Sequence, residues 1–80
     1  MTVDNPIDVR TEALFVSHLQ RSQEPTAELI REAVTATVGR LGESGCAELV
    51  ALEFGEHPDC ALGRMQWARR AVLTAYADSH

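Results

Sequence analysis

Apolar residues recur at helical spacing near the end of the chain. Between Cys60 and Tyr76 an apolar residue returns every three or four positions, which places these side chains on one face of a helix. That face consists of Ala61, Met65, Ala68, Val72 and Ala75. Leu62 widens it. The arginines of the segment point mostly elsewhere: Arg64, Arg69 and Arg70. This is the longest helix-prone run, so we expect it to be the element on which the others pack.

A second apolar stripe follows the polar linker of residues 20–25. Thr26 comes directly after Pro25 and is the expected N-cap of a helix. Gly42 is the expected left-handed residue that stops this helix after Leu41. The inward face of the predicted helix consists of Ile30, Ala33, Val34, Thr37, Val38 and Leu41.

A third, shorter helix is predicted from about Gly45 to Phe54. Ser44 can cap its start, and Gly55 follows as the residue that closes it. By spacing, the residues on its inward face are Cys46, Leu49, Val50 and Phe54.

The N-terminal segment is consistent with a helix or with a short strand. Asn5 and Pro6 are typical of a helix start, with Asn as the cap and Pro in the first turn. The apolar face consists of Val9, Ala13, Val16 and Leu19 or Gln20, broadened by Leu14 and Phe15. Phe15 and Val16 also favour a strand. A single strand has nothing to pair with in this chain, so a helix is the better prediction.

Together these patterns predict an all-α fold: a compact bundle of four helices with a long C-terminal helix. Eighty residues make a single domain, 1–80, in which residues 1–5 and 78–80 are expected to be flexible. The last helix begins in one of two ways: His57 precedes Pro58 in its first turn, or Asp59 is its cap. Because so small a core is only marginally stable, a second copy or a partner would add useful buried surface.

Composition and charge favour a cytoplasmic protein whose main partner is not nucleic acid. The chain has 7 basic and 12 acidic residues and a net charge of −5, which opposes approach to a phosphate backbone. All seven basic residues are arginines, as expected from the GC-rich genome of a bacterium. The sequence contains no recognisable signal peptide and no membrane-spanning run, so we expect reduced thiols and no membrane partner.

An alternative function comes from the two C-terminal helices. A short helix carrying Ala51, then Phe54 and Gly55, a short turn and a longer helix are loosely similar to a helix-turn-helix. The chain would then be a small DNA-binding regulator, with these candidate residues facing DNA: Asp59, Gly63, Arg64, Gln66, Trp67 and Arg70. Residues 59–77 contain three arginines and one acid. Pairing of these arginines with acidic faces of other helices explains that charge equally well.

The sequence carries no recognisable catalytic, cofactor or metal motif. Cys46, His57, Cys60 and His18 are residue types that bind zinc, but a zinc site usually shows two close pairs. His57 and Cys60 would form a nucleophile–base pair only if the turn brings them together. We therefore predict no enzyme activity, no cofactor and no small-molecule substrate, with Cys46 and Cys60 as small core residues.

Trp67 is the only tryptophan and lies at the flank of the apolar stripe. An exposed Trp beside Arg is a typical anchor for a protein partner, so Arg64, Trp67 and Arg70 are the candidate partner-binding residues. In the competing interpretation the first helix covers Trp67 and buries it. The primary prediction is a small non-enzymatic regulatory or adaptor module that acts through protein–protein interaction, with a protein partner or as a homodimer.

Overall fold

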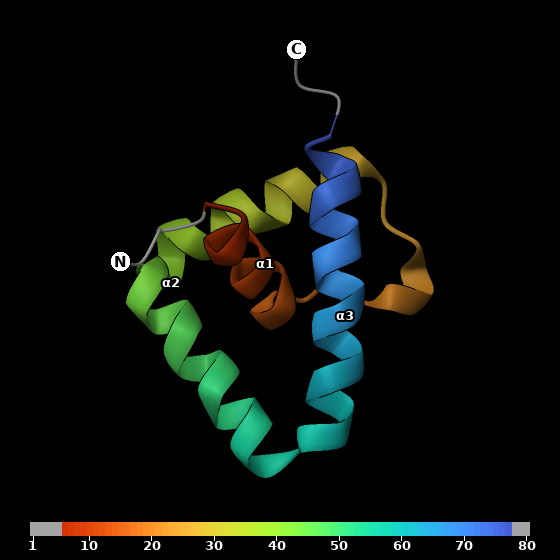
Figure 1. The fold of residues 1–80 in the computed structure, drawn as a ribbon. Helices are drawn as coiled ribbons and strands as arrows, with labels where there is room; N and C mark the ends of the chain where they lie inside the picture. Colours follow the sequence, from red (N-terminus) through yellow and green to blue (C-terminus); the bar gives the residue numbers. More distant parts are fainter. Residues whose placement is uncertain (1–5, 78–80) are drawn as a thin grey trace, which may run out of the picture.

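The computed structural model describes residues 6–77, and all regular structure in this part of the chain is helical (Figure 1). In order, the elements are α1 (Pro6–Val16), the short 3₁₀ helix η1 (Arg21–Gln23), α2 (Ala27–Glu56) and α3 (Pro58–Ala75). The all-α prediction is confirmed, whereas the predicted count of four differs from the three α-helices of the described residues, because α2 contains two helical segments joined by a kink. The expected Asn5 cap and the expected flexibility of residues 1–5 and 78–80 lie outside the described residues.

The difference in helix count arises at Gly42. Thr26 caps α2 as predicted, since its hydroxyl oxygen accepts a hydrogen bond from the Leu29 amide at 3.2 Å. Gly42 has the positive φ expected of it, with φ 74° and ψ 171°. These angles are not helical, so the first helical segment stops at Gly42 as predicted; a second segment begins directly after it, and the two together make up the kinked helix α2. The predicted helix from Gly45 to Phe54 is therefore part of α2, and Ser44 lies inside α2 instead of capping a separate helix.

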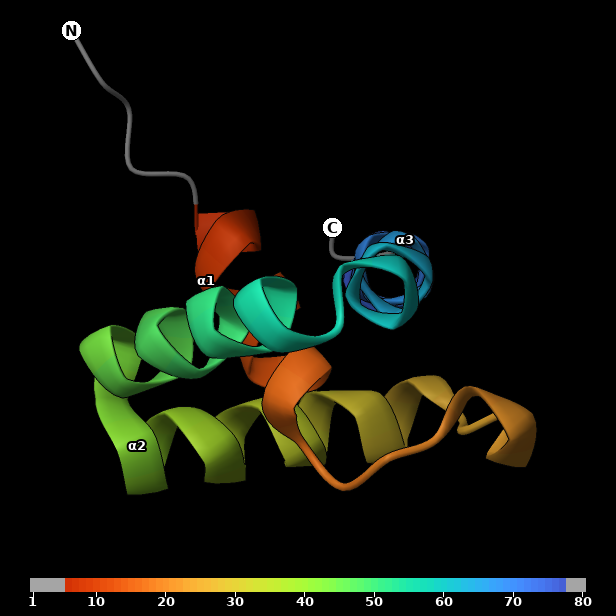
Figure 2. The same ribbon diagram turned by 90° about the horizontal axis from the view of Figure 1, so that it is seen from below.

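The bend in α2 determines the arrangement of the molecule. Residues 27–41, residues 43–56 and α3 form three sides around α1, which lies inside the angle between α2 and α3 (Figure 1). Seen from below, the two halves of α2 lie in different layers, and α3 runs beside the second half (Figure 2). Only His57 separates α2 from α3, with Pro58 in the first turn of α3, which is the first of the two predicted alternatives.

The central element is α1, not the C-terminal helix that the sequence suggested. Ala13, Leu14 and Phe15 are consecutive, and all are 3% exposed or less. Three consecutive residues cover more than half of the circumference of a helix, so α1 must be enclosed on several sides. The helix ends at Val16, earlier than expected, because the Ser17 hydroxyl donates to the Leu14 carbonyl at 2.7 Å and competes with the helical pattern.

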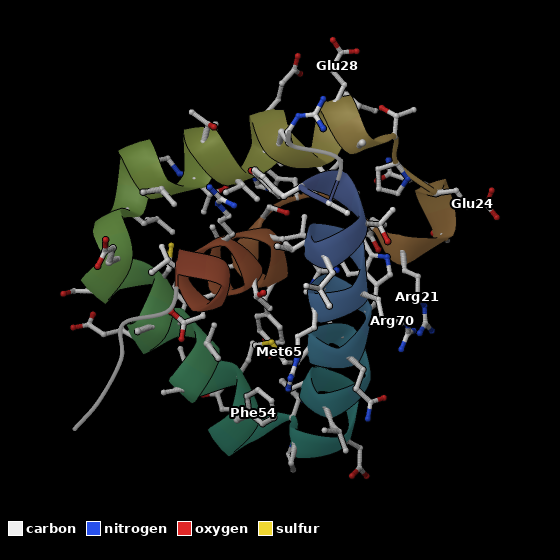
Figure 3. The ribbon with its side chains drawn as sticks, turned by 45° about the horizontal axis from the view of Figure 1, so that its top comes forward. Arg21, Glu24, Glu28, Phe54, Met65 and Arg70 are labelled. Atoms are coloured by element: carbon white, nitrogen blue, oxygen red, sulfur yellow. The ribbon has the colours of Figure 1, made fainter. Side chains whose placement is uncertain are left out.

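The predicted apolar faces of α2 and α3 form most of the remaining core. On α3 the buried residues are Ala61, Trp67, Ala68, Val72 and Ala75. On α2 they are Ile30, Val34, Thr37 and Cys46. Phe54 and Met65 point into the interior between α2 and α3 (Figure 3), and the Phe54 ring stacks on that of Phe15 with centroids 5.9 Å apart. Two placements were wrong: Leu62 is 53% exposed and Leu49 is 39% exposed.

Contacts between distant parts of the chain join the start of α2 and α1 to the end of α3. The Arg31 guanidinium, near the start of α2, donates to the Ala75 carbonyl at the end of α3, at 2.7 Å. The Arg10 guanidinium of α1 lies 4.0 Å from the centroid of the Tyr76 ring. A cation near the last carbonyls of a helix also complements its dipole. No helix within residues 6–77 has the length and apolar character that crossing a bilayer requires.

Candidate functional site

Arg64 is the most highly connected polar side chain of the described structure. Its Nε donates to the Phe15 carbonyl at 2.6 Å. Its Nη2 lies within hydrogen-bond distance of three further carbonyls, those of Leu14 at 3.3 Å, Ser17 at 3.1 Å and Leu19 at 2.9 Å. The last carbonyls of a helix have no partner within it, and Arg64 supplies donors to them at the end of α1. Arg64 was expected to point mostly away from the apolar face of its helix, and in the structure its guanidinium reaches the end of α1.

The guanidinium of Arg64 lies between two aromatic rings. Its Cζ is 5.1 Å from the centroid of the Trp67 ring and 5.9 Å from that of Phe15. Burial lowers the pKa of the Arg64 guanidinium, because removal from water disfavours its charged form. The group nevertheless remains protonated, as arginine does in proteins. Arg64 thus positions the end of α1 against α3, and its charge is committed to carbonyl oxygens of this chain.

Trp67 is almost fully buried, with 9% of its surface exposed. It lines two surface pockets, and Arg21 of η1 lines both of them. Arg64 lines the first of these pockets with Trp67, and Arg70 lines the second. Two pockets that share Trp67 thus bring the three candidate partner-binding residues close together, and residues of the segment 20–25, which includes η1, line both pockets. Arg70 itself is exposed and points outward with Arg21 (Figure 3).

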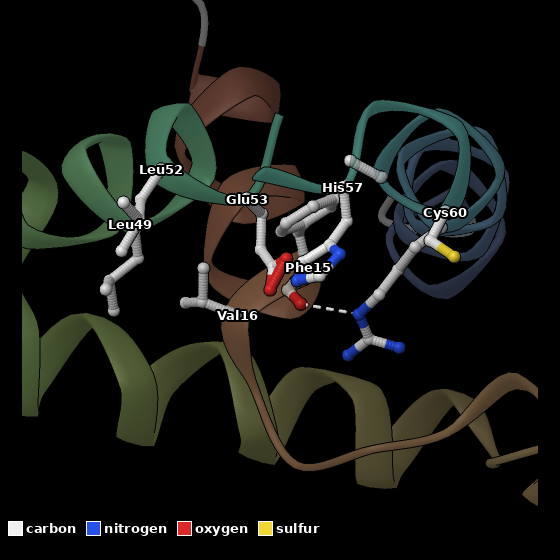
Figure 4. A pocket seen from close by; sticks show the side chains of 9 residues that line it. Phe15, Val16, Leu49, Leu52, Glu53, His57 and Cys60 are labelled. Atoms are coloured by element: carbon white, nitrogen blue, oxygen red, sulfur yellow. Dashed lines mark hydrogen bonds between the residues drawn. The ribbon is translucent and has the colours of Figure 1, made fainter. Parts of the chain in front are cut away.

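A hollow with a more apolar lining lies where the end of α1, the second half of α2 and the start of α3 meet (Figure 4). We call it the groove; its volume is about 520 Å³, within the range of ligand-binding clefts. It is lined by Phe15, Val16, Leu49, Leu52, Glu53, His57, Cys60, Ala61 and Arg64. Leu49 and Leu52 are 39% and 54% exposed. Both leucines therefore line the groove and are also exposed to solvent.

The surroundings of the groove are acidic. Leu49, Leu52, Glu53 and Glu56 follow one another at helical spacing, so two carboxylates share a face of α2 with the two exposed leucines. Residues 43–56 contain four carboxylates and no basic residue. The cation of Arg64 is occupied by backbone carbonyls on the other side of the groove. A ligand in the groove would therefore meet apolar side chains with negative charge along one edge.

The residues weighed for metal binding or catalysis lie in different environments. Cys46 is fully buried, whereas Cys60 is exposed, which corrects the expectation that both are core residues. Cys60 and His57 do line the same groove, but no hydrogen bond joins them in the structure. Among residues 6–77 no group of three His, Cys, Asp or Glu side chains is placed to hold a metal ion.

The residues proposed to face DNA are only partly on the surface. Gln66 and Arg70 are exposed. Gly63 is half-buried beside Trp67, and Arg64 uses its donors inside the molecule. Base reading by arginine requires two free donors directed outward, and the Nε and Nη2 groups of Arg64 are directed at α1.

Comparison with known proteins finds no family model, no curated protein and no solved structure that matches this chain. The geometry of the chain itself is therefore the basis for its proposed function. The groove was missed in the sequence because Leu49 was assigned to the inward face. The available signal was Leu52, an apolar residue outside that predicted face and next to acidic residues.

Proposed function

We propose that this protein is a non-enzymatic regulatory or adaptor module that binds a helix of a partner protein in the groove. The observation that carries the proposal is the pair Leu49 and Leu52, which line an apolar hollow and remain exposed beside it. Exposed apolar side chains that line a concave surface are typical of interaction sites. A groove between helices is suited to an amphipathic helix, which inserts side chains from consecutive turns.

The charge around the groove specifies the chemistry of the partner. Glu53 lines the groove and Glu56 shares its face of α2. A partner helix with Lys or Arg beside its apolar stripe would place positive charge opposite these carboxylates, whereas an acidic helix would be repelled. We therefore expect an apolar segment with basic flanks.

The groove is a better docking site than the three residues first considered. Trp67 is only 9% exposed, and residues of the segment 20–25 line the two pockets beside it. Arg64 contributes to the groove mainly by holding Phe15 and the end of α1 in place. Arg70 is exposed and lies outside the groove. The DNA-binding alternative receives less support, because it needs the donors of Arg64 that carbonyls of α1 occupy.

The experiment uses synthetic amphipathic peptides of about five helical turns, with leucines along one face. One peptide carries lysines beside the leucines, and a second, otherwise identical, carries glutamates. Each is titrated into the ¹⁵N-labelled protein while the amide resonances are followed. We expect the lysine peptide to shift resonances around Leu49, Leu52 and Ala61, and the glutamate peptide to bind much more weakly.

Two surface variants make this test specific. Leu52→Glu places a charge in the groove and should weaken binding of the lysine peptide about tenfold or more. Leu29→Glu is the matched control, because Leu29 is 48% exposed on the first half of α2 and does not line the groove. The proposal fails if the lysine peptide leaves the groove resonances unchanged, or if both variants weaken binding equally.

A further inference from the structure

The outward face of α3 has the chemistry that the groove is expected to recognise. Leu62 and Leu73 are each 53% exposed. They lie eleven residues apart, which returns them to nearly the same side of a helix. Arg69 and Arg70 are exposed and precede Leu73 by one helical turn. Leu73 is thus an exposed apolar side chain with two basic neighbours, on a rigid helix.

We propose that the groove of one copy binds Leu73, Arg69 and Arg70 on α3 of a second copy. This inference rests on the proposed function, because it takes the groove to be a docking site and names its occupant. Leu73 would enter the apolar hollow beside Leu49 and Leu52. The two arginines would lie opposite Glu53 and Glu56.

Charge complementarity supports a second copy as the occupant. Residues 43–56 carry four carboxylates and no basic residue, whereas α3 carries three arginines and one acid. The two surfaces therefore attract each other over short range, although the whole chain has a net charge of −5. A contact between two α3 helices would instead bring Arg69 and Arg70 close to the same residues of the other copy.

The positions of the two surfaces determine the kind of assembly. The groove uses Ala61 and Arg64 in the first turns of α3, whereas Leu73 lies in its last turn. At 1.5 Å per residue these positions are roughly 14–18 Å apart along the helix axis. One copy can therefore offer its groove and its α3 face at the same time. The contact is head to tail, so it continues into a chain of copies or closes into a ring.

The test is sedimentation velocity over a wide range of protein concentration. We expect the unmodified protein to associate into dimers and larger species as concentration rises. Leu52→Glu, in the groove, and Leu73→Glu, on α3, should each weaken association about tenfold or more. Leu29→Glu should leave association unchanged. All three positions are exposed, and helical circular dichroism checks that each variant folds.

Mixing the two weakened variants gives the decisive result. The Leu52→Glu chain retains its α3 face, and the Leu73→Glu chain retains its groove. The mixture should therefore form a dimer of one copy of each and nothing larger. Added salt should weaken this dimer, because opposite charges contribute to the contact.

Three results would overturn the inference: an unmodified protein that stays monomeric, single variants that associate normally, or a mixture that does not form the dimer. In each case the lysine peptide separates the two proposals. If it still binds the groove, the docking function stands and the second copy is not its occupant. If it also fails to bind, the proposed function fails as well.

Discussion

The two halves of α2 meet at the kink at Gly42 and differ in what covers them. Residues 27–41 bury Ile30, Val34 and Thr37 in the core. Residues 43–56 bury only Cys46 and leave Leu49 and Leu52 exposed beside the groove. Both halves carry apolar residues at helical spacing. The first half buries its apolar face within the chain, and the second half leaves part of its apolar residues exposed.

This difference shows the limit of a hydrophobic pattern. Spacing identifies which side chains lie on one face of a helix. It does not show whether the surface that covers them belongs to the same chain. That information depends on the direction in which each segment leaves the kink at Gly42, which no local pattern contains.

The difference between the two halves of α2 can be tested by shortening one apolar side chain in each half to alanine. Ile30 is 6% exposed and Leu52 is 54% exposed. Ile30→Ala should lower the free energy of unfolding by about 2–5 kcal/mol, because it removes buried methyl groups and leaves a cavity. Leu52→Ala should change it by no more than about 0.5 kcal/mol. Urea unfolding followed by circular dichroism measures both values.

Equal losses at the two positions would contradict the comparison. They would mean that Leu52 is buried in solution, either against this chain or in an assembly that persists during the measurement. Repeating the measurement at several protein concentrations separates these cases, because only the assembly makes stability depend on concentration.

A second test concerns the kink that joins the two halves. Gly42 has φ 74° and ψ 171°, a combination that only glycine adopts readily. Gly42→Ala should therefore destabilise the protein by about 1–3 kcal/mol. Gly39 lies in the regular part of α2, and nothing lies within 4 Å of an added Cβ there. Gly39→Ala should stabilise the protein by up to about 1 kcal/mol. Thermal unfolding measures the stability of both variants. A Gly42→Ala variant as stable as the unmodified protein would show that residues other than glycine adopt the backbone conformation of the kink without strain.

Much of the fold was readable from particular residues. The Thr26 cap, the positive φ of Gly42 and the buried faces around Val34 and Val72 follow from local rules of helix geometry. The predicted count of helices differs from the observed one because a glycine with positive φ can kink a helix as well as end it. The sequence alone does not distinguish these outcomes, since they differ only in the residues that follow.

The candidate site was harder to predict. Arg64 was expected at the surface because its position on the helix wheel is polar, yet it donates to carbonyls about fifty residues earlier in the chain. The unsatisfied carbonyls at the end of α1 provide the reason, and their location relative to α3 is a tertiary property. The groove also depends on where α1 lies relative to α3, because Phe15 of α1 forms part of its lining.

A third test asks whether Arg64 supports the groove. Arg64→Met keeps an apolar side chain but removes every donor to the end of α1, so it should destabilise the protein by about 1–2 kcal/mol. Arg69→Met is the control, because Arg69 is exposed on α3. Native-state hydrogen exchange should show faster exchange at the end of α1 and in residues 43–56 than in residues 27–41. Uniform acceleration across α2 would contradict a local role for Arg64.

The smallest expected effects concern the two cysteines. Cys46 lies on the enclosed side of residues 43–56, and Cys60 lies at the start of α3. Burial raises the pKa of the Cys46 thiol; Glu12 raises it further, and Arg40 partly offsets both. Cys60 is exposed. A thiol reagent at neutral pH should therefore modify Cys60 quickly and Cys46 only as the protein unfolds. Mass spectrometry after limited labelling identifies the modified residue. Equal labelling rates would mean that Cys46 is not enclosed in solution.

The raised pKa of Cys46 also sets the sign of a pH effect. Above the unfolded-state thiol pKa of about 8.5, the unfolded chain loses this proton while the folded chain retains it. The folded state then binds more protons, so stability falls as pH rises towards the folded pKa. The contribution of Cys46 is fully present below about pH 8. Urea unfolding of the unmodified protein and of Cys46→Ala between about pH 7 and pH 10 should show a smaller decline in the variant. If both proteins lose stability equally, Cys46 titrates alike in the two states, and the second half of α2 is as open on its inner side as it is at the groove.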